Sequence, residues 1–140
     1  MNNDINIPKL LYPIEVMNIG DNIKLEIGLY EKRKNKFYDV ILRINNSEFF
    51  LGRFNKTYNT VKAKYNDGKI LIYTPEFNDN TKSMQIIEVL SLYEILDDTF
   101  YSCTQEEALN IFDNSIDSSY LKNKNKPIYR MDIEKNKRLK

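Results

Sequence analysis

Apolar and polar residues alternate from Asn22 to Lys32, so every second side chain falls on the same side of the chain. The apolar side of this pattern consists of Ile23, Leu25, Ile27 and Leu29. A period of two residues is typical of a β-strand with one buried face. This stretch therefore predicts a half-buried strand and points the fold class towards antiparallel sheet.

A second strand is expected from Phe37 to Asn45, with Tyr38, Val40, Leu42 and Ile44 facing inward. A short turn at Asn46-Ser47 then joins it to the following strand in a hairpin. Pairing outward from that turn places Ile44 beside Phe49 and Leu42 beside Leu51, so the apolar faces of both strands agree. We therefore expect a hairpin with one buried face here.

A further hairpin is marked by Asn66-Asp67-Gly68-Lys69. Asp and Gly tolerate the positive φ angles that two-residue hairpin turns need. Counting outward from this turn pairs Tyr65 with Ile70 and Ala63 with Ile72. Pro75 is expected to end the second strand, because it has no N–H to give to a neighbouring strand.

Residues 84–90 form an apolar run that suits either a buried strand or a buried helix, and periodicity alone does not separate the two. We favour a last strand that ends near Leu90. Ser91 and Glu94 have the spacing of a helix capping box, which predicts a short helix from Leu92 to Asp98.

A second capping box, Thr104 with Glu107, predicts a second helix. This helix places several apolar residues at helical spacing: Ala108, Leu109, Ile111, Phe112 and Ile116. After it, a short edge strand is expected over residues 128–133.

Together these elements predict an α+β fold, an antiparallel β-meander of five to seven strands followed by two short helices packed on one face, with a short C-terminal edge strand. The 140 residues suggest a single domain, 1–140. Within it, we expect residues 1–13 to form an irregular N-terminal arm and residues 134–140 a basic C-terminal tail.

The residue types of most catalytic and metal sites are missing from this chain. It contains no His, a single cysteine (Cys103) and four glycines that form no phosphate-binding motif. Ser-His and Cys-His dyads and multi-cysteine metal clusters are therefore excluded. We expect no catalytic residues, no metal and no cofactor, and hence a protein that is not an enzyme.

Four residue types, Asn, Ile, Lys and Tyr, make up 61 of the 140 residues. Codons rich in A and T encode all four, so the bias indicates an AT-rich bacterium or one of its phages or mobile elements. The chain shows neither a basic leader segment nor an apolar run of membrane-spanning length. We therefore expect a cytoplasmic protein that does not associate with a membrane.

Charge is unevenly distributed, although the net charge is only +1. Residues 76–119 carry a net charge of −9, whereas residues 120–140 carry +6. We expect an acidic, partner-binding face made of Asp97, Asp98, Glu106, Glu107, Asp113 and Asp117. One interpretation is a surface for a basic partner, and the other is internal neutralisation by the basic tail.

Basic and aromatic residues are also expected to share one face of the sheet. An alternative nucleotide or nucleic-acid face consists of Arg43, Phe50, Lys62, Lys64 and Tyr73, with Arg43 opposite Phe50. A third reading is that the helices cover this face, which would place Leu71, Tyr73, Phe50 and Ile41 in the core.

We expect a non-enzymatic accessory protein of a phage or mobile element that binds another protein through the acidic face. Its partner would be a host protein with a basic surface, such as a nucleic-acid-handling or defence protein, which it inhibits or modulates. The alternative is a nucleotide or nucleic-acid binding module that uses the basic and aromatic face.

Overall fold

Antiparallel sheet dominates the computed structural model, which describes residues 7–128. The described chain forms two compact units, residues 7–60 and residues 61–128. The expected antiparallel, sheet-rich character is confirmed. The division into two units is finer than the single domain that the length suggested.

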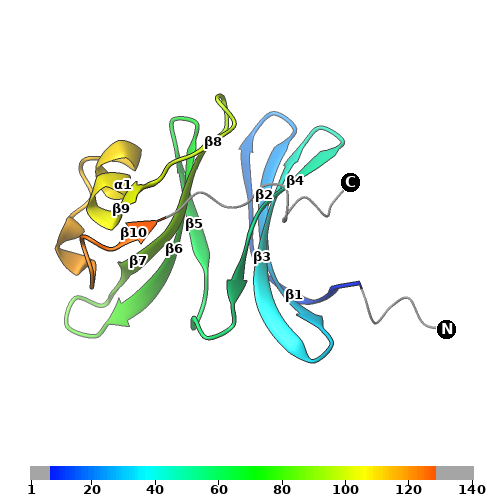
Figure 1. Cartoon of the computed structure of the whole chain (residues 1–140), viewed down its shortest axis with the longest axis horizontal. Coiled ribbons are helices and arrows are strands. Elements are labelled where there is room, and N and C mark those ends of the chain that lie inside the picture. The colour runs from blue at the N-terminus through cyan, green and yellow to red at the C-terminus, as the bar shows by residue number, and fades with distance from the viewer. Residues whose placement is uncertain (1–6, 129–140) are drawn as a thin grey trace. The chain divides into compact units, whose positions relative to one another are not determined.

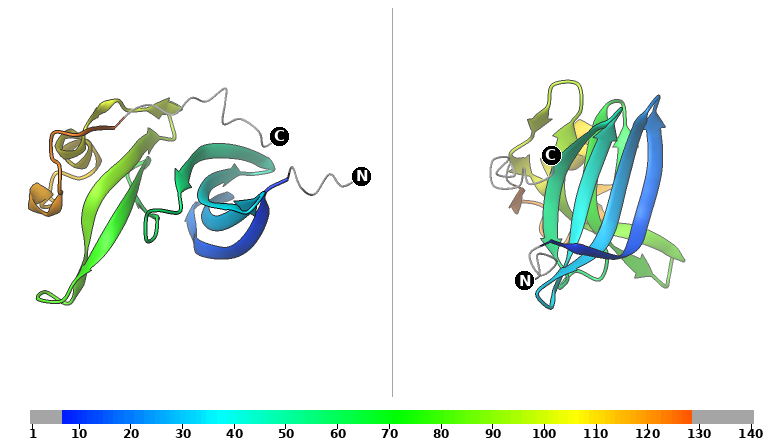
Figure 2. Two further views of the ribbon diagram at one scale, coloured as in Figure 1. Left: turned by 60° about the horizontal axis from the view of Figure 1, so that its bottom comes forward. Right: turned by 90° about the vertical axis from the view of Figure 1, so that its right-hand side faces the viewer.

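The first unit is a four-stranded meander in the order β1-β2-β3-β4 (Figure 1; Figure 2, right). Its strands are β1 (Lys9–Gly20), β2 (Ile23–Lys32), β3 (Asn35–Ile44) and β4 (Ser47–Asn55). The alternation in β2 is realised as predicted, because Leu25, Ile27 and Leu29 are buried. They lie opposite Leu42, Val40 and Tyr38 of β3, which are also buried.

The predicted irregular arm is wrong from Lys9 onward, where β1 begins. Pro13 is compatible with this strand because β1 lies at the edge of its sheet, where one row of backbone groups needs no partner strand. The pairing with β2 shifts register between Leu10 and Tyr12 and again between Pro13 and Glu15. Residues 1–6 of the predicted arm lie outside the described residues.

The β3–β4 hairpin forms, but its predicted register is wrong. The turn lies at Asn45-Asn46, where Asn45 adopts φ 55°, so Leu42 pairs with Phe49 and not with Leu51. A register shift after Ile41 then adds one residue on β4. Asn tolerates the left-handed backbone conformation, which moves the turn one residue towards the N-terminus.

The second unit contains a four-stranded antiparallel sheet in the order β5-β6-β7-β8. Its strands are β5 (Lys62–Asn66), β6 (Lys69–Asn78), β7 (Ser83–Glu94) and β8 (Thr99–Phe100). A two-stranded sheet pairs β9 (Cys103–Thr104) with β10 (Pro127–Ile128). The helices are α1 (Gln105–Phe112) and the 3₁₀-helix η2 (Ser118–Tyr120). Two four-stranded sheets therefore replace the predicted single meander of five to seven strands.

The β5–β6 hairpin has the predicted register, with Tyr65 opposite Ile70 and Ala63 opposite Ile72. Asp67 and Gly68 both adopt positive φ, at 49° and 81°. A Cβ at Gly68 would also lie 2.9 Å from the carboxylate of Glu94. The positive φ angle is the reason that favours glycine at this position, because the Glu94 carboxylate ends a flexible side chain that can shift.

Pro75 does not end its strand, contrary to the prediction, because β6 continues to Asn78. β5 pairs with β6 only as far as Tyr73, so at Pro75 the sheet has β7 as its neighbour on one side. A register shift between Thr74 and Pro75 accommodates the missing N–H.

Residues 84–90 are strand, as favoured, but the helix predicted from Leu92 to Asp98 is wrong. β7 extends to Glu94 and pairs Leu92 with Leu71 of β6. The Ser91 side chain is buried and makes no cap. Burial of the strand in the sheet outweighs the local capping signal here.

The capping box of the second predicted helix is confirmed, since Thr104 and Glu107 exchange both hydrogen bonds at the start of α1. The helix lies against the β5–β8 sheet (Figure 1), where its buried residues join the core of the second unit. This core comprises Leu71, Tyr73, Ile86, Val89, Leu92, Ala108, Leu109, Phe112, Leu121 and Ile128.

α1 ends at Phe112, earlier than expected, and Ile116 packs against the core from the following loop. Of the predicted C-terminal edge strand, the structure describes only Ile128, in β10. The rest of that strand and the basic tail 134–140 lie outside the described residues.

Candidate functional site

The six acidic residues predicted to form a partner face lie on three separate elements. Asp97 and Asp98 occupy the exposed turn between β7 and β8. Glu106 and Glu107 form the first turn of α1. Asp113 and Asp117 follow the helix, although the predicted helix, which reached Ile116, would have placed both near one of its faces. The reason is that α1 is capped at Asp113, one turn earlier than the apolar spacing suggested.

Glu106 and Glu107 are both engaged in local structure. Glu107 caps the backbone N–H of Thr104 at 2.9 Å, and Glu106 accepts a hydrogen bond of 3.0 Å from the Ser118 hydroxyl. Acidic residues in the first turn also stabilise a helix through its dipole. Their position is thus accounted for by the helix itself and by its contact with η2.

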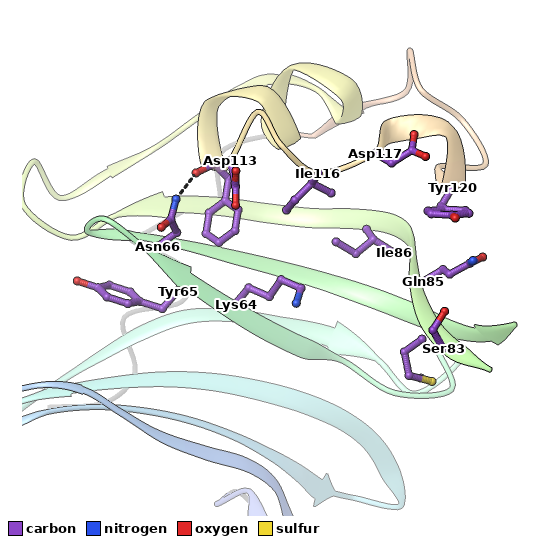
Figure 3. Close-up of a pocket in the computed structure, with 12 residues that line it drawn as sticks. Lys64, Tyr65, Asn66, Ser83, Gln85, Ile86, Asp113, Ile116, Asp117 and Tyr120 are labelled. Carbon is purple, nitrogen blue, oxygen red and sulfur yellow. Dashed lines mark hydrogen bonds between the residues drawn. The ribbon is translucent and has the colours of Figure 1, made fainter. Parts of the chain in front are cut away.

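Asp113 and Asp117 are brought together in another way, because both line one cleft of about 500 Å³ (Figure 3). Strands β5 and β7 form one side of this cleft, and the segment from Phe112 to Tyr120 forms the other. Asp113 lies at one end, beside Asn66, whose side-chain amide donates to the Phe112 carbonyl at 2.8 Å. Asp117 lies with Tyr120 at the other end.

Three large side chains with apolar surface gather around this cleft and are each more than a third exposed. Met84 is 56% exposed, Tyr120 is 41% exposed and Tyr65 is 40% exposed. Ile86 and Ile116 contribute apolar surface between the two ends. Lys64 also lines the cleft, so the charged lining residues are two carboxylates and one ammonium group.

Both cleft carboxylates are held in the ionised form by hydrogen bonds. The Ser115 hydroxyl, at 2.7 Å, and its N–H, at 3.0 Å, lower the pKa of Asp113 below the ordinary value. The Ser119 N–H, at 2.9 Å, lowers the pKa of Asp117, and Lys124 adds a weaker electrostatic effect. Both donors come two residues after the carboxylate, which is an Asx-turn arrangement.

Part of the acidic segment is neutralised by lysines that follow it in the chain. Lys122 lies 3.5 Å from Glu76, and Lys126 lies 2.6 Å from Glu88. Within residues 7–128, however, no lysine or arginine comes within ion-pair distance of Asp113 or Asp117. Within the described residues, direct ion pairs with these lysines therefore form at Glu76 on β6 and Glu88 on β7.

The predicted basic and aromatic face is divided between the two units, with Arg43 and Phe50 in the first and Lys62, Lys64 and Tyr73 in the second. Arg43 lies opposite Glu48, not Phe50, and forms ion pairs with Glu26 and Glu48. Phe50 and Tyr73 are buried, so neither ring is available for stacking.

The sequence pattern is also compatible with helices that cover this face of the sheet. This is observed for Leu71 and Tyr73, which belong to the same core as the buried residues of α1. Ile41 and Phe50 are buried as well. Lys62 lies opposite Tyr73 in the sheet register, as predicted, while Lys64 approaches the Tyr73 ring at 5.9 Å and reaches the acidic cleft.

Cys103 is half-buried, and burial, followed by the negative charge of Glu107, raises the pKa of its thiol. A raised pKa lowers the fraction of nucleophilic thiolate. Across the described residues, no three His, Cys, Asp or Glu side chains gather into a metal-binding group.

One charged pair was missed by the sequence analysis. Asp39 on β3 is fully buried and binds Arg53 on β4 through two hydrogen bonds, of 2.8 and 3.0 Å. The signal was present, because an acidic residue in the middle of an apolar strand is rarely buried without a partner. The incorrect β3–β4 register placed Asp39 and Arg53 on different faces and hid the pair.

Comparisons with protein-family models, with curated proteins and with solved structures each find no match to this chain. Among residues 7–128, no helix has the length and apolar character that crossing a membrane would require.

Proposed function

We propose that this chain is a non-enzymatic protein-binding module whose cleft in the second unit receives a basic segment of a partner protein. The observation that carries the proposal is the combination of Asp113 and Asp117 with the exposed side chains of Met84, Tyr65 and Tyr120 around one cleft. Tyr and Met are enriched in protein interfaces, and the two carboxylates would favour a partner of opposite charge.

A cationic side chain is the expected occupant of this cleft. Asp113 and Asp117 carry full negative charge at neutral pH, and their turns fix them in place before a partner arrives. The Tyr120 ring beside Asp117 adds a face that attracts an arginine or lysine side chain. The volume of about 500 Å³ lies in the usual range of ligand clefts and suits one long side chain with its neighbours.

The biological setting is part of the same proposal. The bias towards Asn, Ile, Lys and Tyr supports an accessory protein of a phage or mobile element in an AT-rich bacterium. A partner with a basic surface fits a host nucleic-acid-handling or defence protein in the cytoplasm, which the module would inhibit or modulate. Charge complementarity between the two would mainly increase the association rate.

The experiment compares wild-type protein with the double variant Asp113→Asn and Asp117→Asn as bait in the lysate of an AT-rich bacterium. Asn keeps the side-chain oxygen that accepts the turn hydrogen bonds but removes both charges. A matched control, Asp21→Asn with Asp79→Asn, removes two charges from exposed turns elsewhere. The lysate is treated with nuclease so that nucleic acid cannot bridge bait and protein.

A basic protein captured by the wild type and the control, and lost with the cleft variant, supports the proposal. The captured protein is then purified and titrated against all three baits at low and high salt. Equal affinity for the cleft variant and the wild type would contradict the proposed site. Nucleic acid as the bound species in an untreated lysate, with no protein partner, would contradict the proposed function.

A further inference from the structure

Asp39 and Arg53 form an ion pair in which the burial of the carboxylate is energetically unfavourable. The Asp39 side chain has no exposed surface, whereas the Arg53 side chain is 31% exposed. Removing a carboxylate from water is expensive, and a buried ion pair is seldom more stabilising than apolar residues of similar size. A benefit other than stability is therefore expected, and fixing the orientation of Arg53 is one that the geometry supports.

The guanidinium of Arg53 is fixed both in its plane and in its direction. Nε binds Asp39 Oδ1 at 2.8 Å and Nη2 binds Oδ2 at 3.0 Å, which is a side-on, bidentate arrangement. Cζ lies 3.9 Å from the centre of the Phe37 ring. A guanidinium has five N–H donors, so this arrangement leaves the N–H groups of Nη1 and one of Nη2 directed away from Asp39.

Arg53 lines a pocket of about 700 Å³ in which every charged lining residue is cationic. The lining residues are Lys34, Asn35, Lys36, Phe37, Arg53 and Asn55. Within the described chain, no carboxylate lies in ion-pair distance of Lys34 or Lys36, although Glu31 is opposite Lys36 in the β2–β3 register.

The pocket also offers an amide donor of fixed orientation. Asn55 accepts a hydrogen bond of 2.9 Å from the Thr57 N–H through its side-chain oxygen. Its side-chain NH₂ is then left as the donor end of the amide. Arg53, two lysines and this amide together form a set of donors with no lining acceptor of formal negative charge.

The turn that contains Lys34 has an unfavourable backbone conformation. Arg33 and Lys34 both adopt positive φ, at 53° and 70°, in the two-residue turn between β2 and β3. A left-handed backbone is unfavourable for a residue other than glycine, and Asn or Gly is the usual choice. The other two-residue hairpin turns use Asn, Asp or Gly at their positive-φ positions: Asn22, Asn45, Asp67 and Gly68.

From this geometry we infer an anion-binding site at Lys34, Lys36, Arg53 and Asn55 that takes a phosphate group. A phosphate offers several oxygen acceptors around one centre, which matches a fixed guanidinium fork flanked by two ammonium groups. The phosphate group is the chemistry that the site recognises, whether it belongs to a free mononucleotide or to a nucleic-acid strand. This site is in the first unit and does not depend on the acidic cleft.

The test titrates the full-length protein, in phosphate-free buffer at 50 mM chloride, with inorganic phosphate, with a 5′-mononucleotide and with a 12-residue oligothymidylate. The site variant is Lys34→Asn with Lys36→Gln. Its matched control is Lys9→Gln with Lys24→Gln, which removes two exposed lysines from β1 and β2. Binding is measured by isothermal titration calorimetry and, for the labelled oligonucleotide, by fluorescence anisotropy.

We expect the site variant to bind phosphate-bearing ligands about tenfold or more weakly, while the control binds like the wild type within a few-fold. Lys34→Asn should raise the melting temperature rather than lower it, because Asn relieves the backbone cost of the turn. A weaker ligand affinity in a more stable protein separates a binding role from a structural one.

A third variant, Arg53→Lys, keeps the charge and loses the bidentate fork, and is expected to weaken binding although the net charge is unchanged. Affinity that is the same for the mononucleotide and the oligonucleotide identifies a small phosphate ligand as the source. Affinity that rises with strand length identifies a nucleic-acid strand. No saturable binding by the wild type, or equal affinity of the site variant and the control, would overturn the proposal.

Discussion

The two units hold their charged groups in opposite ways. In the first unit, a fully buried carboxylate on β3 fixes the partly exposed Arg53, so the orientation of this cation depends on the packed sheet. In the second unit, Asp113 and Asp117 are fixed by donors only two residues away in the chain, outside any regular element of the sheet. We therefore expect the first site to be coupled to the stability of the fold. A change of charge at the second site should cost the fold little stability.

The largest expected effect follows from breaking the buried pair. Arg53→Met should lower the free energy of unfolding by about 3–5 kcal/mol, because Asp39 stays buried after its cationic partner is lost. Chemical denaturation monitored by circular dichroism measures this change. The double variant Asp39→Leu with Arg53→Met serves as the control and should regain most of the loss. A loss below about 1 kcal/mol for Arg53→Met would show that the first site is as loosely coupled to the fold as the second.

A comparable effect is expected from the core of the same unit. Leu42→Ala removes a fully buried side chain and should cost about 2–5 kcal/mol in unfolding free energy. Lys24→Ala on β2 is exposed and should cost less than about 0.5 kcal/mol. Denaturation midpoints of the two variants give the comparison, and equal costs would mean that the faces of the first sheet are assigned incorrectly.

An intermediate effect is expected at the start of α1, which leads into the cleft of the second unit. Thr104→Ala removes the cap of the Glu107 N–H and should cost about 1 kcal/mol. Thr104→Ser keeps the hydroxyl and is the matched control. Thermal melts of both variants check this, and identical melting temperatures would show that the cap contributes nothing to the second unit.

A smaller stability effect is expected in the acidic cleft itself. Asp113→Asn with Asp117→Asn should leave the free energy of unfolding at pH 7 almost unchanged, since Asn can keep both turns. Chemical denaturation of this variant and of the Arg53→Met variant under the same conditions compares the two losses of unfolding free energy directly. A loss of several kcal/mol would remove the contrast between the two units.

The smallest effect is a shift in a single titration. Ser115→Ala removes the hydroxyl donor and should raise the pKa of Asp113 towards the ordinary carboxyl value of about 3.9. Because the folded pKa of Asp113 lies below the unfolded one, its stabilising contribution is complete at pH 7. That contribution is lost as the pH falls through the folded pKa. A carboxyl carbon NMR titration measures the shift, with Ser119→Ala as the variant that should leave Asp113 unchanged.

Local signals predicted the elements whose chemistry lies within a few residues. The Asp67-Gly68 turn fixed the β5–β6 register, and Thr104 with Glu107 fixed the start of α1. The same reasoning failed at Ser91, because strand pairing with β6 decides the conformation there. The four residues of a capping box contain no information about pairing with β6, a strand about twenty residues earlier in the chain.

The site residues show the same limit at longer range. The pair of Asp39 and Arg53 depends on a turn that is shifted by one residue and on one extra residue in β4. An error of this size moves a side chain to the other face of a sheet. The cleft could not be predicted from the sequence either. The helix α1 ends earlier than expected, and Asp113 and Asp117 line the cleft from the segment that follows it.

The edge strand β1 has a consequence for how copies of this protein behave at high concentration. Leu10, Tyr12 and Val16 are each about half exposed along this edge, and an exposed apolar edge strand is a template for fibrous aggregation. Pro13 lacks an N–H, and the register shifts around it interrupt the flat, regular row of backbone groups that another strand would need. We therefore expect Pro13 to allow the strand to form within the sheet and to hinder the pairing of its free edge with a further copy.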